Sequence, residues 1–157
     1  MHSFLERVYH FLDVGEYPVG IFCDLSKAFD CVDQKKLMTK LYAYGIRGLA
    51  LGWVKTFLEN RTQYVSINNN NSESHQVKQG VPQGSVLGPV LYLLYVNEID
   101  SLSSSTHFTI YADDTSLITS NMNENALEAD CNSLLSNLTE WFYQNSLYIN
   151  INKTKIL

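Results

Sequence analysis

The sequence holds few cysteines, and their spacing matches no disulfide or zinc framework. Cys23, Cys31 and Cys131 are an odd number, and no Cys-x-x-Cys pair occurs among them. A disulfide framework needs an even set of cysteines, and a structural zinc site needs closely spaced ligands. Neither a disulfide framework nor a zinc site is expected, and this use of cysteine is typical of proteins in an intracellular, reducing compartment.

Long hydrophobic runs and a basic leader are also missing. The longest apolar run, Val90–Val96, is far too short to cross a bilayer, and no basic-then-apolar segment opens the chain. Neither membrane insertion nor secretion is expected. The apolar pattern begins by Phe4 and continues to Leu157, so we expect the sequence to be a fragment of a longer protein.

An excess of positive charge is the third absence. The net charge is -5 at pH 7, whereas proteins that grip phosphate backbones are usually basic. Either nucleic acid is not the partner, or the basic surfaces lie outside this segment. With 157 residues and 45% hydrophobic content, the chain can still form one globular domain with a real core.

The hydrophobic pattern predicts an α+β domain in which helices pack on an antiparallel sheet. Strands are predicted at Val19–Cys23, Phe108–Tyr111, Thr115–Thr119 and Leu147–Asn152. Helices are predicted at Lys35–Tyr44, Leu49–Leu58, Val86–Ile99 and Leu127–Trp141, and an exposed hairpin loop at Asn68–Ser74. The turn at Asp113-Asp114 is too short for a crossover, which favours antiparallel pairing.

Two adjacent aspartates stand between the predicted strands of "TIYADDTSLI". Asp113 and Asp114 would be unremarkable in an exposed turn, because aspartate favours turns. Alternatively, a divalent cation would reverse the repulsion between them. A third carboxylate, Asp24, ends a predicted buried strand. If that strand lies beside the hairpin, the three can hold two metals about 3.5–4 Å apart, as in polymerases and nucleases.

Four segments carry a family resemblance: "FCDLSKAFDCVD", "QGVPQGSVLGP", "YADD" and "NSLYININKTK". Their order and context resemble those of reverse transcriptases, closest to the non-LTR (LINE-like, jockey-like) retrotransposons. The resemblance implies the palm of a right-hand polymerase with part of its fingers. Residues 1–157 would then be a partial reverse transcriptase domain that lacks the upstream finger motifs, the primer grip and the thumb.

The implied activity is that of a retrotransposon RNA-directed DNA polymerase. It adds dNTPs to a primer 3′-OH by two-metal-ion nucleotidyl transfer, with two Mg²⁺ ions and Mn²⁺ as a substitute. The implied partners are an RNA template, a DNA primer and dNTPs, in the nucleus, the cytoplasm or both. The missing finger and thumb segments hold much of the nucleic-acid contact, so the isolated fragment is expected to be inactive.

The resemblance also implies roles for acidic and basic residues. Asp24 and Asp113 would bind the catalytic metals, Asp114 would complete the acidic cluster, and the Leu25 carbonyl would face a metal. Lys153 matches a lysine near the leaving pyrophosphate, where an ammonium can donate a proton or stabilise charge. A lysine near a strand end is otherwise simply solvated.

Phe29 matches the family residue that packs under the incoming sugar, where it would exclude a ribose 2′-OH. Equally, it could be a core residue between a strand and a helix. Gln83 and Gly84 match residues that contact the incoming nucleotide and the template-primer duplex, and could also form a simple turn capped by Ser85. Backbone N–H groups of the segment from Ser26 through Lys27 and Ala28 to Phe29 are expected to cradle the triphosphate.

Three rival interpretations stay open. The chain could be a non-catalytic, polymerase-like RNA-binding or assembly module, although the intact acidic residues argue against it. It could be a metal-dependent nuclease, although a nuclease needs no nucleotide pocket such as the one at Phe29 and Gln83. Finally, it could come from a degenerate copy of an element.

Overall fold

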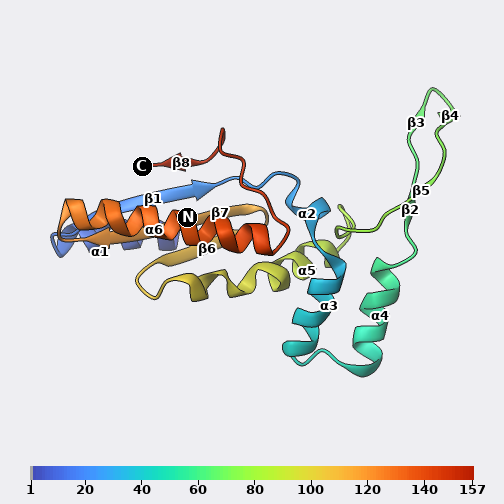
Figure 1. Ribbon diagram of the computed structural model, residues 1–157, viewed down its shortest axis with the longest axis horizontal. Helices are drawn as coiled ribbons and strands as arrows, with labels where there is room; N and C mark the ends of the chain where they lie inside the picture. Colours follow the sequence, from blue (N-terminus) through green and yellow to red (C-terminus); the bar gives the residue numbers. More distant parts are fainter. Residues whose placement is uncertain (1) are drawn as a thin grey trace. The chain divides into compact units, whose positions relative to one another are not determined.

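The computed structural model describes residues 2–157, which form two compact units (Figure 1). The first unit comprises the residues up to Ala28 together with Val96–Leu157, and the second comprises Phe29–Tyr95. Within the described residues, every helix is too short or too polar to cross a membrane.

The first unit is built on a four-stranded antiparallel sheet with the strand order β6-β7-β1-β8. Its strands are β1 (Tyr17–Cys23), β6 (His107–Tyr111), β7 (Asp114–Asn121) and β8 (Lys155–Ile156). Ile21 of the central strand β1 pairs with Leu117 on one side and with Ile156 on the other. The predicted antiparallel sheet is confirmed.

Helices cover both faces of this sheet. The ring of Phe4 in α1 (His2–Asp13) lies 5.3 Å from the ring of Phe22. The next residue, Cys23, lines a cavity together with side chains of α6 (Glu124–Gln144). Because successive side chains of a strand point to opposite faces, α1 and α6 lie on opposite sides of β1. The core under α6 includes the fully buried Leu138.

The 3₁₀ helix η1 (Asn97–Leu102) leads into β6 and packs against α6. Ile99 is its buried side chain. The predicted helix Val86–Ile99 is therefore two elements, because the α-helix ends at Val96.

The second unit consists of helices and one long hairpin. Its helices are α2 (Ala28–Cys31), α3 (Gln34–Ala43), α4 (Gly48–Leu58) and α5 (Leu87–Val96). In the hairpin, β2 (Thr62–Gln63) pairs with β5 (His75–Gln76), and β3 (Ser66–Ile67) pairs with β4 (Asn70–Asn71). Asp33 caps α3 by accepting hydrogen bonds from the N–H groups of Lys35 and Lys36.

Two sequence predictions are corrected. The hairpin loop is tighter than Asn68–Ser74, because Asn68 and Asn69 alone form the turn, with φ angles of 49° and 64°. Asparagine tolerates this left-handed conformation, which suits a two-residue hairpin turn.

The predicted strand Leu147–Asn152 is wrong. Only Ile149 forms a bridge there, with Leu25, and the strand β8 begins later. The Asn150 carbonyl accepts hydrogen bonds from the N–H groups of Lys153 and Thr154 and from the Thr154 hydroxyl. These local bonds stabilise a turn, which competes with strand pairing.

Candidate active site

Asp24 and the Asp113-Asp114 turn lie at the same end of the sheet. Tyr111 pairs with Asp114, so Ala112 and Asp113 form the hairpin loop. The pairing of β1 with β7 runs to Cys23 and Thr115, and one further step brings Asp24 level with Asp114. Residues level on neighbouring strands share a face and interact. Two carboxylates from distant parts of the chain are therefore level with each other at this edge.

Strained backbone accompanies both acidic segments. Ala112, directly before Asp113, has a φ of 54°, and Lys27, shortly after Asp24, has a φ of 50°. A left-handed conformation costs a residue with a side chain about 1–2 kcal/mol. Such strain persists only where surrounding structure fixes it, and it is frequent at functional sites.

Lys153 is held beside Asp24 by the C-terminal tail, which comprises residues 147–157. The tail forms a bridge at Ile149, opposite Leu25 just beyond β1, and pairs with β1 at Lys155, opposite Phe22. Between these contacts the tail has five residues, 150 to 154, whereas the facing segment has only Cys23 and Asp24. The tail therefore loops out. In this loop the Lys153 Nζ lies 3.7 Å from Asp24 Oδ2, and the Asp24 side chain is 33% exposed.

The same tail fixes the backbone that follows Asp24. Asn150 N–H donates to the Asp24 carbonyl at 2.8 Å, and Ser26 N–H donates to the Tyr148 carbonyl at 2.8 Å. In an antiparallel bridge of this kind, the N–H and C=O of the residue between the two bonds point the other way. The Leu25 carbonyl thus points to the side of β1 on which β7 lies. Leu25 itself is buried.

This tail contact corrects one expectation. The Ser26 N–H is engaged by Tyr148, so the expected row of phosphate-binding amides starts no earlier than Lys27. The structure shows Lys27 as an exposed residue and Ala28 as a buried one.

The carboxylate edge offers oxygen donors of the kind that bind a divalent cation. Asp113 and Asp114 are exposed, and carboxylate oxygens are the ligands that Mg²⁺ prefers. In the described part of the chain, no group of three or more Asp, Glu, His or Cys side chains is close enough to hold a metal ion. Adjacent residues at a strand end diverge, which separates Asp113 from Asp114. Mg²⁺ usually takes one or two carboxylates plus substrate phosphates, so the donor set fits, and the expected metal-binding roles stay predictions.

Phe29, Gln83 and Gly84 belong to the second unit. The Phe29 ring packs against Tyr92 with 4.8 Å between ring centroids, and its side chain is half-buried. Val81 N–H donates to the Phe29 carbonyl at 2.9 Å, which joins the glycine-rich loop to α2. Gln83 Nε2 donates to the Asp30 carboxylate at 3.0 Å. No local sequence pattern marks this partnership, because the two residues are far apart along the chain.

Glycines and one arginine shape the loop that carries Gln83. Gly80 has a φ of 81°, and a Cβ there would lie 2.8 Å from the Asp30 carbonyl oxygen. Arg61 donates to the Gly80 carbonyl at 2.8 Å, and burial lowers the pKa of its guanidinium. Gly84 has a φ of 75° with open space around it. Arg61 is a positioning residue that the sequence did not mark.

The expected turn and cap before α5 are also present. Ser85 Oγ accepts from Gly88 N–H at 3.0 Å and donates to the Pro82 carbonyl at 2.7 Å. The interpretation of this segment as a turn capped by Ser85 is therefore confirmed. A capped turn leaves room for a further role of Gln83 and Gly84, which stays a prediction.

Comparisons with known proteins agree with the resemblance. The family described as reverse transcriptase (RNA-dependent DNA polymerase) matches residues 1–157. The chain is 33% identical over 160 residues to the RNA-directed DNA polymerase from mobile element jockey of Drosophila melanogaster, covering 95% of this chain and 17% of that protein. It is 30% identical over 158 residues to the probable RNA-directed DNA polymerase from transposon X-element of the same species, covering 98% and 17%. The chain thus spans about 17% of the length of these relatives.

Solved structures agree on the fold. The apo telomerase from Candida tropicalis, truncated from its C-terminal domain, matches with a TM-score of 0.70 at 17% identity, covering 100% of this chain and 35% of that chain. Telomerase from Candida albicans matches with a TM-score of 0.71 at 16% identity, covering 96% and 28%. At this identity the likeness shows the fold alone, which is that of a right-hand polymerase, as predicted. Since the family match spans the whole sequence, the chain belongs to the reverse transcriptase (RNA-dependent DNA polymerase) family.

Proposed function

We propose that this chain forms the palm and part of the fingers of an RNA-directed DNA polymerase of a non-LTR retrotransposon. One observation carries the proposal. The register of β1 and β7 brings Asp24 level with Asp114, and the tail holds Lys153 Nζ 3.7 Å from Asp24 Oδ2. This edge combines acidic oxygen donors with one positioned cation in a chain of the reverse transcriptase family.

In the proposed reaction, a primer 3′-OH attacks the α-phosphate of a dNTP and pyrophosphate leaves. Bound divalent metal ions would supply charge stabilisation for the attacking and leaving oxygens. Asp24, Asp113 and the Leu25 carbonyl would hold those ions, and Asp114 would keep the edge acidic. Lys153 would move from Asp24 to donate a proton to the leaving pyrophosphate or to stabilise its charge.

The nucleotide would be selected by residues of the second unit. Phe29 would pack under the sugar and exclude a 2′-OH, while Gln83 and Gly84 would contact the nucleotide and the duplex. The backbone at Lys27 and Ala28 would lie along the triphosphate. RNA template, DNA primer and the segments outside this chain would complete the working enzyme.

The test is primer extension on an RNA template by the full-length protein with dNTPs and Mg²⁺. We expect incorporation that EDTA abolishes and that added Mg²⁺ or Mn²⁺ restores. The double variant Asp113→Asn with Asp114→Asn should lose more than about 100-fold in rate, because even groups that only support a metal ligand cost 10–100-fold. Asp100→Asn, an exposed aspartate of η1, is the matched control and should retain activity.

Two results would contradict the proposal. Extension by the double variant at the wild-type rate would remove the acidic turn from the mechanism. A folded, full-length wild type that incorporates nothing would favour the non-catalytic RNA-binding or assembly module.

A further inference from the structure

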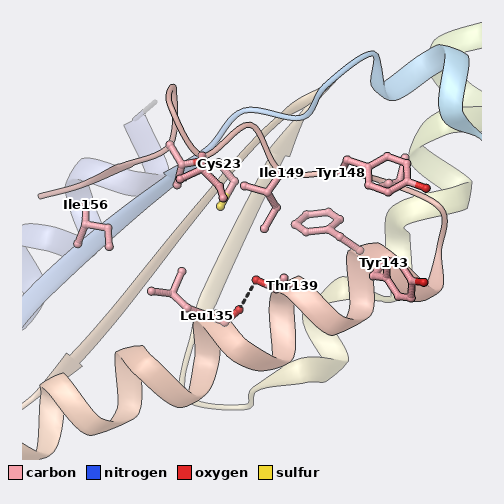
Figure 2. A pocket seen from close by; sticks show the side chains of 11 residues that line it. Cys23, Leu135, Thr139, Tyr143, Tyr148, Ile149 and Ile156 are labelled. Carbon is pink, nitrogen blue, oxygen red and sulfur yellow. Dashed lines mark hydrogen bonds between the residues drawn. The ribbon is translucent and has the colours of Figure 1, made fainter.

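The first unit contains an apolar cavity of about 450 Å³ away from the acidic edge (Figure 2). One wall comes from α6, through Leu135, Thr139 and Tyr143, and the opposite wall comes from Cys23 and the C-terminal tail. Cavities of 300–1,000 Å³ that are lined mainly by apolar and aromatic side chains are typical of small-molecule sites. Its size and lining therefore make it a candidate ligand site.

The tail wall of the cavity is the segment that positions the acidic edge. Tyr148 and Ile149 line the cavity and also pair with the backbone at Leu25 and Ser26. Thr154, another lining residue, ends the loop that carries Lys153. Cys23 lines the cavity and precedes Asp24 directly. Anything that moves this wall therefore moves the supports of Asp24 and Lys153.

The lining defines the chemistry of a suitable ligand. No charged side chain is among the lining residues of this described cavity. The Thr139 hydroxyl is already used, since it donates to the Leu135 carbonyl at 2.8 Å. A charged ligand would lose its hydration without finding a partner, whereas a neutral aromatic one would lose little.

We propose that this cavity binds a neutral, aromatic small molecule of two or three rings, and that binding shifts the tail segment Tyr148–Thr154 so that Lys153 is drawn away from the whole acidic edge. The cavity is thus a regulatory site on the face of β1 opposite the carboxylate of Asp24. The effect on catalysis rests on the proposed polymerase function, whereas binding and the tail shift do not.

The test uses the full-length protein and N-phenyl-1-naphthylamine, a neutral three-ring probe that fluoresces when it is bound in an apolar site. Saturable binding to one site is expected. Thr139→Trp and Leu135→Phe fill the cavity from α6 and should each weaken binding at least 10-fold. Ser136→Trp, on the exposed side of the same helix, is the matched control and should bind as the wild type does. Unfolding curves of all variants verify that they fold.

Two further readouts test the coupling. Amide hydrogen exchange at Asn150 and Lys153, whose N–H groups donate to the carbonyls of Asp24 and Asn150, should change at least 5-fold on probe binding. Primer extension should lose most of its kcat, with the KM for dNTP unchanged within 2-fold. Absence of saturable binding, or binding that both cavity-filling variants leave intact, would overturn the site. Binding without a change in exchange would overturn the coupling, and binding with changed exchange in a protein that lacks polymerase activity would contradict only the proposed function.

Discussion

Lys153 Nζ lies 3.7 Å from Asp24 Oδ2 although the lysine side chain is 68% exposed. Exposed ion pairs of this kind contribute about 0–1 kcal/mol to stability. The contact therefore contributes little to stability, and its main consequence is that the tail places an ammonium group beside Asp24.

Replacing Lys153 with alanine should separate catalysis from stability. We expect the free energy of unfolding to change by less than about 1 kcal/mol, since the pair is exposed. The rate of nucleotide incorporation should fall by roughly 10²-fold or more, the usual effect of removing a general acid. Lys155→Ala, an exposed lysine of β8, should have little effect on either quantity. Equal activity losses in the two variants would reject a specific role for Lys153.

Replacing Phe29 with valine should relax sugar selection. The ratio of ribonucleotide to deoxynucleotide incorporation is expected to rise, because the ring would no longer exclude the 2′-OH. The lost ring contact with Tyr92 should also cost about 0.5–1.5 kcal/mol of stability. Phe57→Val removes another half-buried ring of the second unit, which contacts Trp53, and should lower stability without altering the ratio. An unchanged ratio in the Phe29 variant would favour the core interpretation.

Alanine at Gly80 and at Gly84 should differ in cost. Both glycines have positive φ, so each substitution adds about 1–2 kcal/mol of backbone strain. At Gly80 the new Cβ would also lie 2.8 Å from the Asp30 carbonyl oxygen, whereas nothing lies within 4 Å of a Cβ at Gly84. Denaturant unfolding should therefore show a clearly larger loss for Gly80→Ala. Equal losses would mean that the loop backbone can move away from α2.

Cys23 should make stability fall at alkaline pH. Burial raises the pKa of its thiol from 9.0 to about 11, so the folded protein keeps the proton where the unfolded chain loses it. The stabilisation is complete below pH 9 and is lost as pH rises toward 11, at about 1.4 kcal/mol per pH unit. Cys23→Ala lacks this titration, so the difference in unfolding free energy between wild type and variant should shrink over that range. Parallel curves would show that the thiol is not shielded.

The periodicity of the sequence was sufficient for most elements because their burial is one-sided. The helical spacing from Leu127 to Trp141 marks such a face, and Leu127, Leu134 and Leu138 of α6 are buried. The predicted strand from Phe108 is also present. The tail shows where this fails. Leu147, Ile149 and Ile151 alternate as a strand would, yet local hydrogen bonds to the Asn150 carbonyl produce a turn. The alternation of apolar and polar residues does not indicate which carbonyl oxygen accepts a hydrogen bond from a nearby N–H group.

The candidate site was predictable in part. Asp24, Asp113 and Asp114 were expected at one edge if the strand before Asp24 lay beside the hairpin. That strand does pair with β7, and the register places Asp24 level with Asp114. The contact between Lys153 and Asp24 depends on how many residues the tail loops out, which no sequence pattern states. The same holds for Gln83 with Asp30 and for Arg61 with Gly80, since these partners are far apart along the chain.

The strand order β6-β7-β1-β8 also sets an order of events during folding. Strand β1 is synthesised before its partners, because Ile21 pairs with Leu117 and Ile156, which come much later in the sequence. Contacts between such distant residues form slowly, because the intervening chain must first be closed into a loop. The helical hairpin α3–α4 and the short ladders of the second unit need only near neighbours and can form while the rest is still being synthesised. The carboxylate edge is therefore among the last parts of the chain to assemble.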